Sequence, residues 1–175
     1  MGRIRSPEQA LLFIGTLYSD PGISDRSSEI IGKNFGEILF SSHALPWDYS
    51  TYYKKELGCP LFRQFIFFKN LIDTGTLADI KLKTNEIEDL LSSEGKRRIN
   101  LDPGYLTPAK IVLASTKNYA HRIYLGKGIY GEVTLTYKDK DGIYKPQLYT
   151  YRDYQDKTYV EIFMSAREFL RKKSG

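Results

Sequence analysis

Acidic and basic side chains that could bind a phosphate group gather in residues 97–132. In the segment RRINLDPGYL, Pro103 and Gly104 are the residue types of a type II turn, which would place Asp102 at the end of a strand. A carboxylate held there can bind Mg²⁺ or act as a base. The alternative is that it only accepts hydrogen bonds from its own turn, in which case its role is structural.

A second group of reactive side chains lies in LASTKNYAHRIYL, where Lys117, His121 and Arg122 fall within six positions. These are three kinds of phosphate-binding side chain. On a helix, Lys117 and His121 would share a face. The alternative is that His121 caps a helix end or fills a packing position. We expect an anion-binding cluster here, with His121 as a candidate proton acceptor.

The glycine-rich segment LGKGIYGEVTL matches the G-x-G-x-x-G-x-V pattern of the protein-kinase phosphate loop. No other kinase motif is present, so the pattern predicts a glycine-rich hairpin. Glu132 would leave this hairpin close to Asp102 if the two strands pair. Asp102 and Glu132 are therefore our candidate ligands for Mg²⁺ and, with His121, our candidate catalytic residues.

The segment PWDYSTYYKKELG combines the candidate ligands Asp48 and Glu56 with tyrosines that could stack on a nucleobase. Aromatic packing and helix capping explain the same residues without a ligand. Arg63, which lies among aromatic residues in a predicted strand, has the same two interpretations. The sequence leaves both open.

Several common activities lack their motifs. The chain has no G-x-x-x-x-G-K-[ST] loop, no H-E-x-x-H, no C-x-x-C and no G-x-S-x-G elbow. Two histidines and the single cysteine, Cys59, make zinc catalysis improbable and exclude an internal disulfide. The apolar residues 10–18 run into Asp20 without a signal-peptide cleavage site and predict a first strand. We expect a cytoplasmic protein that does not cross a membrane.

The spacing of apolar and turn residues predicts an α+β fold with a largely antiparallel sheet. The first half predicts the βαββαβ order of ferredoxin-like folds, extended by a C-terminal β-meander and a helix. Residues 107–117 open with Thr107-Pro108, typical of a helix start, although their β-branched residues would also suit a strand. One domain covering residues 1–175 is expected. The predicted strands are 10–18, 37–42, 61–68, 97–101, 122–125, 132–137 and 144–150, and the helices are 24–35, 47–58, 76–93, 107–117 and 160–172.

Charge is distributed unevenly along the chain. Residues 1–95 hold 10 Lys and Arg against 13 Asp and Glu, whereas residues 96–175 hold 16 against 8. Ten of the 14 tyrosines also lie between Tyr105 and Tyr159. A basic, tyrosine-rich second half could bind RNA. An exposed sheet with solvated lysines explains the same composition.

The segments PWDYSTYYKKELG, LKTN, RRINLDPGYL, ASTKNYAHRIYL, GIYGEVTLTY and TYRDY together resemble an uncharacterised prokaryotic family, the domain of unknown function number 4416. The resemblance covers nearly the whole chain and implies a shared fold and site, without a known reaction. Some relatives carry the label GTP-binding protein. The site residues that the resemblance implies are Asp48, Glu56, Arg63, Asn100, Asp102, Lys117, His121, Arg122, Glu132 and Asp153.

These observations lead to one main expectation and two alternatives. We expect a binding site for a phosphate-bearing small molecule, in particular a nucleotide such as GTP. The site could also carry out Mg²⁺-dependent phosphoryl or phosphoester chemistry. The alternatives are an RNA-binding module and a protein-interaction or assembly module. The main expectation requires that the carboxylates and cations on either side of residues 107–117 face a shared cavity.

Overall fold

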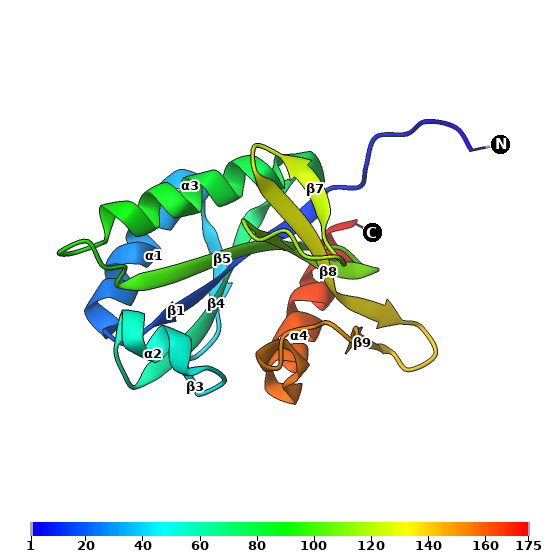
Figure 1. Cartoon of the computed structure of the whole chain (residues 1–175). Helices are drawn as coiled ribbons and strands as arrows, with labels where there is room; N and C mark the ends of the chain where they lie inside the picture. The colour runs from blue at the N-terminus through cyan, green and yellow to red at the C-terminus, as the bar shows by residue number, and fades with distance from the viewer. Residues whose placement is uncertain (1, 175) are drawn as a thin grey trace.

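The computed structural model describes residues 2–174 and shows one mixed sheet-and-helix architecture (Figure 1). The strands are β1 (Ala10–Tyr18), β2 (Ile38–Ser41), β3 (Leu45–Trp47), β4 (Leu61–Ile72), β5 (Ile99–Leu106), β6 (Lys110–Ser115), β7 (Ile123–Gly126), β8 (Ile129–Lys138) and β9 (Ile143–Pro146). The helices are α1 (Pro21–Phe35), α2 (Thr51–Leu57), α3 (Leu77–Leu90) and α4 (Lys157–Ser174), with short 3₁₀ turns η1 (Thr74–Thr76) and η2 (Asp153–Gln155).

The sheet order confirms the predicted antiparallel α+β fold. Along the sheet the strands run β2-β4-β1-β5-β6-β8-β7, with β3 paired to β4 and β9 paired to β8. Every pairing is antiparallel. Strand β4 lies between β1 and β2, and β1 lies between β4 and β5. This is the split arrangement of a ferredoxin-like βαββαβ unit. Strands β7–β9 and helix α4 form the predicted C-terminal meander and helix.

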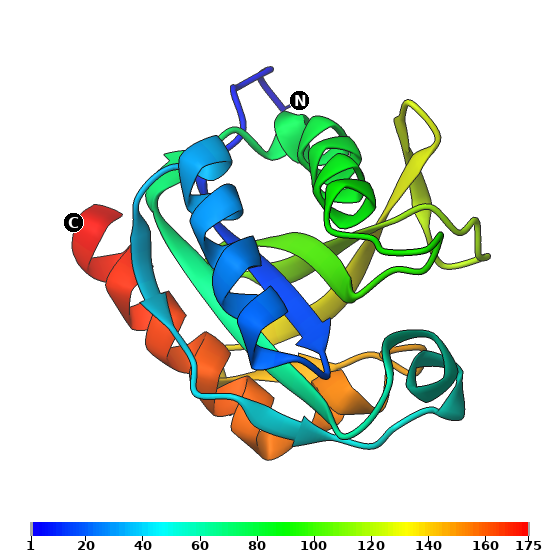
Figure 2. The ribbon, with the colours of Figure 1, turned by 90° about the vertical axis from the view of Figure 1, so that its left-hand side faces the viewer.

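Alternating strand residues build a hydrophobic core on each face of the sheet. On one face, Ile14 and Ile66 pack with Ile31 of α1 and Ile87 of α3. On the other, Phe13 and Phe65 pack with Phe163 of α4. Figures 1 and 2 show α1 and α3 on the first face and α4 on the second. Because successive side chains of a strand point to opposite faces, one strand such as β1 supplies both cores.

Local signals in the sequence define several helix ends. The Asp20 side chain caps α1 by accepting from the backbone N–H of Gly22, and Pro21 takes the first helical position, where its missing N–H costs nothing. Gly36 ends α1 with φ of 100°. Ser50, rather than Asp48, caps α2. The predicted helix over residues 24–35 therefore begins about one turn too late, because the helix already starts at Pro21 after the Asp20 cap.

Two further local predictions are corrected. Residues 107–117 contain strand β6, not a helix. The Thr107 hydroxyl does accept from the N–H groups of Ala109 and Lys110, as a cap would, but the chain turns back into a hairpin with β5. Asp102 does not end a strand before a turn, because β5 continues through Pro103 and Gly104 to Leu106.

The N-terminal apolar residues form strand β1, as predicted, and this strand lies between β4 and β5 in the sheet. None of the helices within residues 2–174 combines the length and the apolar character needed to cross a bilayer.

Candidate functional site

A cavity of about 770 Å³ opens where strands β5 and β6 separate. The two strands pair only from Gly104 to Leu106 on β5, which face Leu113 to Ile111 on β6. Pro103, immediately before this paired stretch, has no N–H to donate to a neighbouring strand. Beyond it the strands diverge, and Asn100 and Asp102 on β5 line one side of the cavity while residues 113–117 line another.

Side chains of α3 replace the missing strand partner of β5. The Lys81 ammonium donates to the backbone oxygen of Leu101 at 2.8 Å, and the Glu88 carboxylate accepts from the Leu101 N–H. Burial raises the pKa of Glu88 despite the neighbouring Lys81 and Arg97 cations. Lys81, Asn85 and Glu88 are spaced so that they share one helix face, and all three line the cavity.

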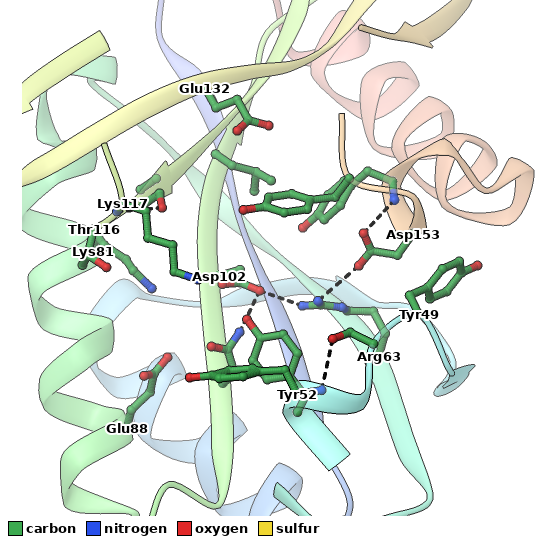
Figure 3. Close-up of a pocket in the computed structure, with 18 of the residues that line it drawn as sticks. Tyr49, Tyr52, Arg63, Lys81, Glu88, Asp102, Thr116, Lys117, Glu132 and Asp153 are labelled. Atoms are coloured by element: carbon green, nitrogen blue, oxygen red, sulfur yellow. Dashed lines mark hydrogen bonds and ion pairs between the residues drawn. The ribbon is translucent and has the colours of Figure 1, made fainter. Parts of the chain in front are cut away.

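The floor of the cavity is a buried network around Arg63. Its guanidinium donates to Asp102 at 2.9 Å and to Asp153 at 3.3 Å, and the Arg63 side chain is only 4% exposed. The Asn100 side chain donates to the same Asp102 oxygen at 2.8 Å. Trp47 donates to Asp153 at 3.1 Å. This network positions the two carboxylates rigidly (Figure 3).

Asp102 is held in its ionised form. Burial alone would raise the pKa of its carboxyl, but the Arg63 guanidinium and then the Lys81 ammonium lower it below the usual value. The side chain keeps 26% of its surface exposed and lines the cavity. Asp102 therefore presents a negative charge at the cavity floor at neutral pH.

Lys81 and Lys117 supply positive charge to the cavity without a direct ion pair, although Lys81 lies close enough to Glu88 and Asp102 to influence both carboxylates. Both side chains line the cavity and extend into it on the side of Asp102 (Figure 3). Across residues 2–174, neither ammonium forms an ion pair with a carboxylate; Lys81 bonds the Leu101 carbonyl, and Lys117 lies 5.9 Å from the centre of the Tyr52 ring. In contrast, Arg97 is bound to Glu56 at 2.7 and 2.8 Å and to Glu88 at 3.0 Å.

An aromatic wall faces the lysines. Trp47, Tyr49, Tyr52 and Tyr53, from the start of α2 and the segment before it, line the cavity. Tyr53 packs edge-on against both Trp47 and Tyr52, with ring centres 5.6 and 5.2 Å apart. Burial raises the pKa of Tyr53, so its hydroxyl stays protonated and can donate. The wall offers both ring surface and hydroxyl groups to a ligand.

A second ion-pair network closes the cavity beside β8. Arg122 donates to Glu132 at 2.8 Å, and both side chains are buried, at 1% and 2% exposed. His121 bonds the same Glu132 oxygen at 3.0 Å. The Arg122 guanidinium also donates to Ser115 and to the Tyr151 hydroxyl, at 2.7 and 2.8 Å. In this network the charges of Arg122 and Glu132 neutralise each other.

The cavity brings together most, though not all, of the residues that the sequence suggested. Seven line it: Arg63, Asn100, Asp102, Lys117, Arg122, Glu132 and Asp153. His121 is not among the lining residues and contacts the site through Glu132. Glu56 reaches it only through Arg97, and Asp48, whose side chain is 80% exposed, pairs with Lys54 on the surface. Among residues 2–174, no three acidic, histidine or cysteine side chains form a group that could hold a metal ion.

Lys81, Glu88 and Arg97 are site residues that the sequence analysis missed. The available signal was their spacing in the predicted helix, since Lys81 and Glu88 lie seven residues apart beside Ile80 and Ile87 of its apolar face. Charged residues on a buried helix face need partners, and their presence there is a signal of a polar site.

Comparison with known proteins places the chain in one family. A family model described as Domain of unknown function (DUF4416) matches residues 8–169, and the chain therefore belongs to this family. Searches of curated proteins and of solved structures found no match.

Proposed function

We propose that the cavity binds a small anionic molecule with a planar group, and that this ligand is a nucleotide. One observation carries the proposal: two lysines that form no direct ion pair with a carboxylate within residues 2–174 enter the same cavity as an aromatic wall. Lys81 is deeply buried by the surrounding protein, since its exposed fraction is 7%. A buried cation that keeps free N–H donors favours a negatively charged partner.

The size of the cavity agrees with such a ligand. Small-molecule sites typically measure about 300–1,000 Å³, and this cavity measures about 770 Å³. A phosphate would bind Lys81 and Lys117, while a base would stack against the tyrosine wall. Stacking on an aromatic side chain contributes roughly 1–3 kcal/mol per base and tolerates different bases. The arrangement itself does not select GTP over other nucleotides.

Ligand-induced thermal stabilisation tests the proposal directly. A panel of nucleoside mono-, di- and triphosphates at millimolar concentration, with and without Mg²⁺, should raise the melting temperature of the protein if the cavity binds them. Isothermal titration would then measure the dissociation constant of the best ligand for the wild type and for Lys117→Ala. Loss of one charge-assisted hydrogen bond should weaken binding by about 10- to 100-fold.

Lys140→Ala is the matched control. Lys140 is exposed in the turn between β8 and β9 and does not line the cavity, so this variant removes the same charge at a distance. Its affinity for the ligand should equal that of the wild type. If no nucleotide changes the melting temperature, or if the two lysine variants behave alike, the proposal is wrong.

Mg²⁺-dependent chemistry at this site is a further part of the proposal. Mg²⁺ commonly binds through one or two carboxylates together with ligand phosphates, and Asp102 is the ionised carboxylate beside the lysines. Release of inorganic phosphate, measured in the same nucleotide panel with and without Mg²⁺, reports on this chemistry. No release from a bound triphosphate would restrict the proposal to binding.

RNA binding is a second candidate, favoured by exposed aromatic rings next to the cavity. The His121 ring stacks on Tyr149 at 4.3 Å and lies 5.9 Å from Tyr119, and the two tyrosines are 39% and 48% exposed. Such rings can stack on unpaired bases. This function predicts that affinity for single-stranded RNA falls steeply between about 50 and 200 mM salt, and that Tyr149→Ala weakens it. Fluorescence anisotropy with a labelled oligonucleotide would measure both.

A further inference from the structure

The two oxygens of the Asp102 carboxylate have different surroundings. Oδ2 accepts from Arg63 at 2.9 Å and from Asn100 at 2.8 Å. Within the described part of the chain, Oδ1 accepts no hydrogen bond. A carboxylate oxygen can accept two hydrogen bonds, and one that is partly desolvated favours a donor. Asp102 lines the cavity and its side chain is 26% exposed. Its Oδ1 atom is therefore available to a ligand in the cavity.

Asp153 provides an internal comparison. It is the other carboxylate bound to Arg63, but both of its oxygens are used. Oδ2 accepts from Arg63 and Trp47, and Oδ1 accepts from the backbone N–H of Tyr154 at 3.0 Å. Its side chain is 7% exposed, against 26% for Asp102. Asp153 therefore uses both of its oxygens within the protein. Asp102 also binds Arg63, but its Oδ1 atom can still accept a hydrogen bond from a ligand in the cavity.

The position of Asp102 within the cavity indicates what kind of donor it would meet. It lies on β5, at the floor of the cavity, between the two lysines Lys81 and Lys117 and the tyrosines of the aromatic wall (Figure 3). In a nucleotide the group between the phosphate and the base is the sugar. The donors that a sugar offers are its hydroxyl groups, and a vicinal pair of hydroxyls suits one carboxylate oxygen with two acceptor sites.

We propose that Asp102 recognises the vicinal hydroxyl pair of a phosphorylated ribose, so that the site selects ribose phosphates over their deoxy analogues. This inference rests on the proposed function and names the part of the ligand that determines specificity. A site built to bond a ligand hydroxyl strongly rejects an analogue without it, because its own polar group is then left unpaired. We expect the 2′-deoxy analogue to bind about 10- to 100-fold more weakly.

The test compares ligands on the unmodified protein, which avoids any effect of a substitution on folding. Isothermal titration with GMP, 2′-deoxy-GMP, ribose 5-phosphate and 2-deoxyribose 5-phosphate gives a ribose-to-deoxyribose affinity ratio with and without a base. A ratio of at least about tenfold in either pair supports the inference. Comparison of GMP with ribose 5-phosphate then distinguishes a nucleotide from a sugar phosphate as the source of the same chemistry.

Two variants assign the ratio to one carboxylate. Asp102→Asn should bind ribose and deoxyribose ligands nearly equally, because the amide no longer offers a charged acceptor. Asp141→Asn makes the same chemical change at an exposed carboxylate between β8 and β9 that does not line the cavity, and should keep the wild-type ratio. Circular dichroism and the melting temperature confirm that each variant is folded before titration.

The outcomes separate this inference from the proposed function. If ribose and deoxyribose ligands bind the wild type equally, the hydroxyl recognition is wrong, although nucleotide binding stands. Hydroxyl recognition by Asp102 is also wrong if Asp102→Asn keeps the wild-type ratio. If none of the four ligands binds at millimolar concentration, the proposed function fails and the inference fails with it.

Discussion

Replacement of Arg63 by methionine is the most direct test of the buried network beneath the cavity. Methionine replaces the aliphatic part of the arginine side chain but carries no charge, so Asp102 and Asp153 would lose their shared cation. Removal of one partner from a buried ion pair typically destabilises a protein by about 3–5 kcal/mol. Arg63 is only 4% exposed and bonds both carboxylates, so solvent screening does not reduce this effect appreciably. We expect the free energy of unfolding to fall by about 3–5 kcal/mol.

The loss should depend on pH in a defined direction. In the wild type the pKa of Asp102 is below its usual value, so its stabilising effect is present at neutral pH and is lost as pH falls through that lowered pKa. Without Arg63, burial would instead raise the pKa of Asp102 above the unfolded value of about 3.9. The variant is then penalised at pH 7, and protonation relieves the penalty as pH falls. The difference from wild type should be larger at pH 7 than at pH 5.

Urea unfolding at both pH values measures this difference. The single tryptophan, Trp47, bonds Asp153 in the same network and is 5% exposed, which makes its fluorescence a suitable signal. Arg98→Met is the control, because Arg98 pairs with Asp20 at the surface with 44% and 46% of the two side chains exposed. Such a pair contributes about 0.2–1 kcal/mol. The reasoning is refuted if both variants lose the same stability, or if the Arg63→Met deficit is equal at pH 5 and pH 7.

Three further substitutions test other parts of the structure by thermal and chemical unfolding. Gly104→Ala should destabilise the protein by at least about 1–3 kcal/mol, because its Cβ would lie 2.6 Å from the Phe13 ring and from a backbone oxygen of β6; an unchanged melting temperature would contradict the close packing there. Gly32→Ala should have the opposite sign and stabilise by about 0.5–1 kcal/mol, since Gly32 is helical in the last turn of α1 and the atom nearest to an added Cβ would be 3.9 Å away; a loss of stability would contradict the space described there. Glu132→Gln keeps the side-chain shape but leaves the buried Arg122 cation without a carboxylate, and should cost about 3 kcal/mol; a change below about 1 kcal/mol would show that the pair is not effectively buried.

The sequence was sufficient to predict those elements whose apolar pattern has one interpretation. Residues 10–18 form a strand with the predicted ends, and Gly36 ends α1 as expected. Thr107 misled the prediction because its hydroxyl makes the same local hydrogen bonds at a helix start and in a β-turn. The pairing of Ile111 with Leu106 across the hairpin and with Leu135 of β8 decides between them, and the contact with Leu135 is not local in sequence.

The candidate site was predictable in composition but not in its division of roles. Residues around Asp102, Lys117 and Glu132 do line one cavity, as expected from their chemistry. The sequence could not show that Glu132 is neutralised by Arg122 while Lys117 has no carboxylate partner in the described chain, because pairing depends on strand register. A one-residue change of register would reverse which side chains face the cavity.

The amide of Leu101 offers a way to follow the helix beside the cavity in solution. Its proton is held by a side chain of α3 instead of by a neighbouring strand, so its rate of exchange with solvent reflects how firmly α3 is docked on the sheet. The amides of Tyr105 and Leu106, a few residues along the same strand, belong to the paired part of the sheet and report on global unfolding. One strand thus carries two independent reporters, one for the helix and one for the sheet.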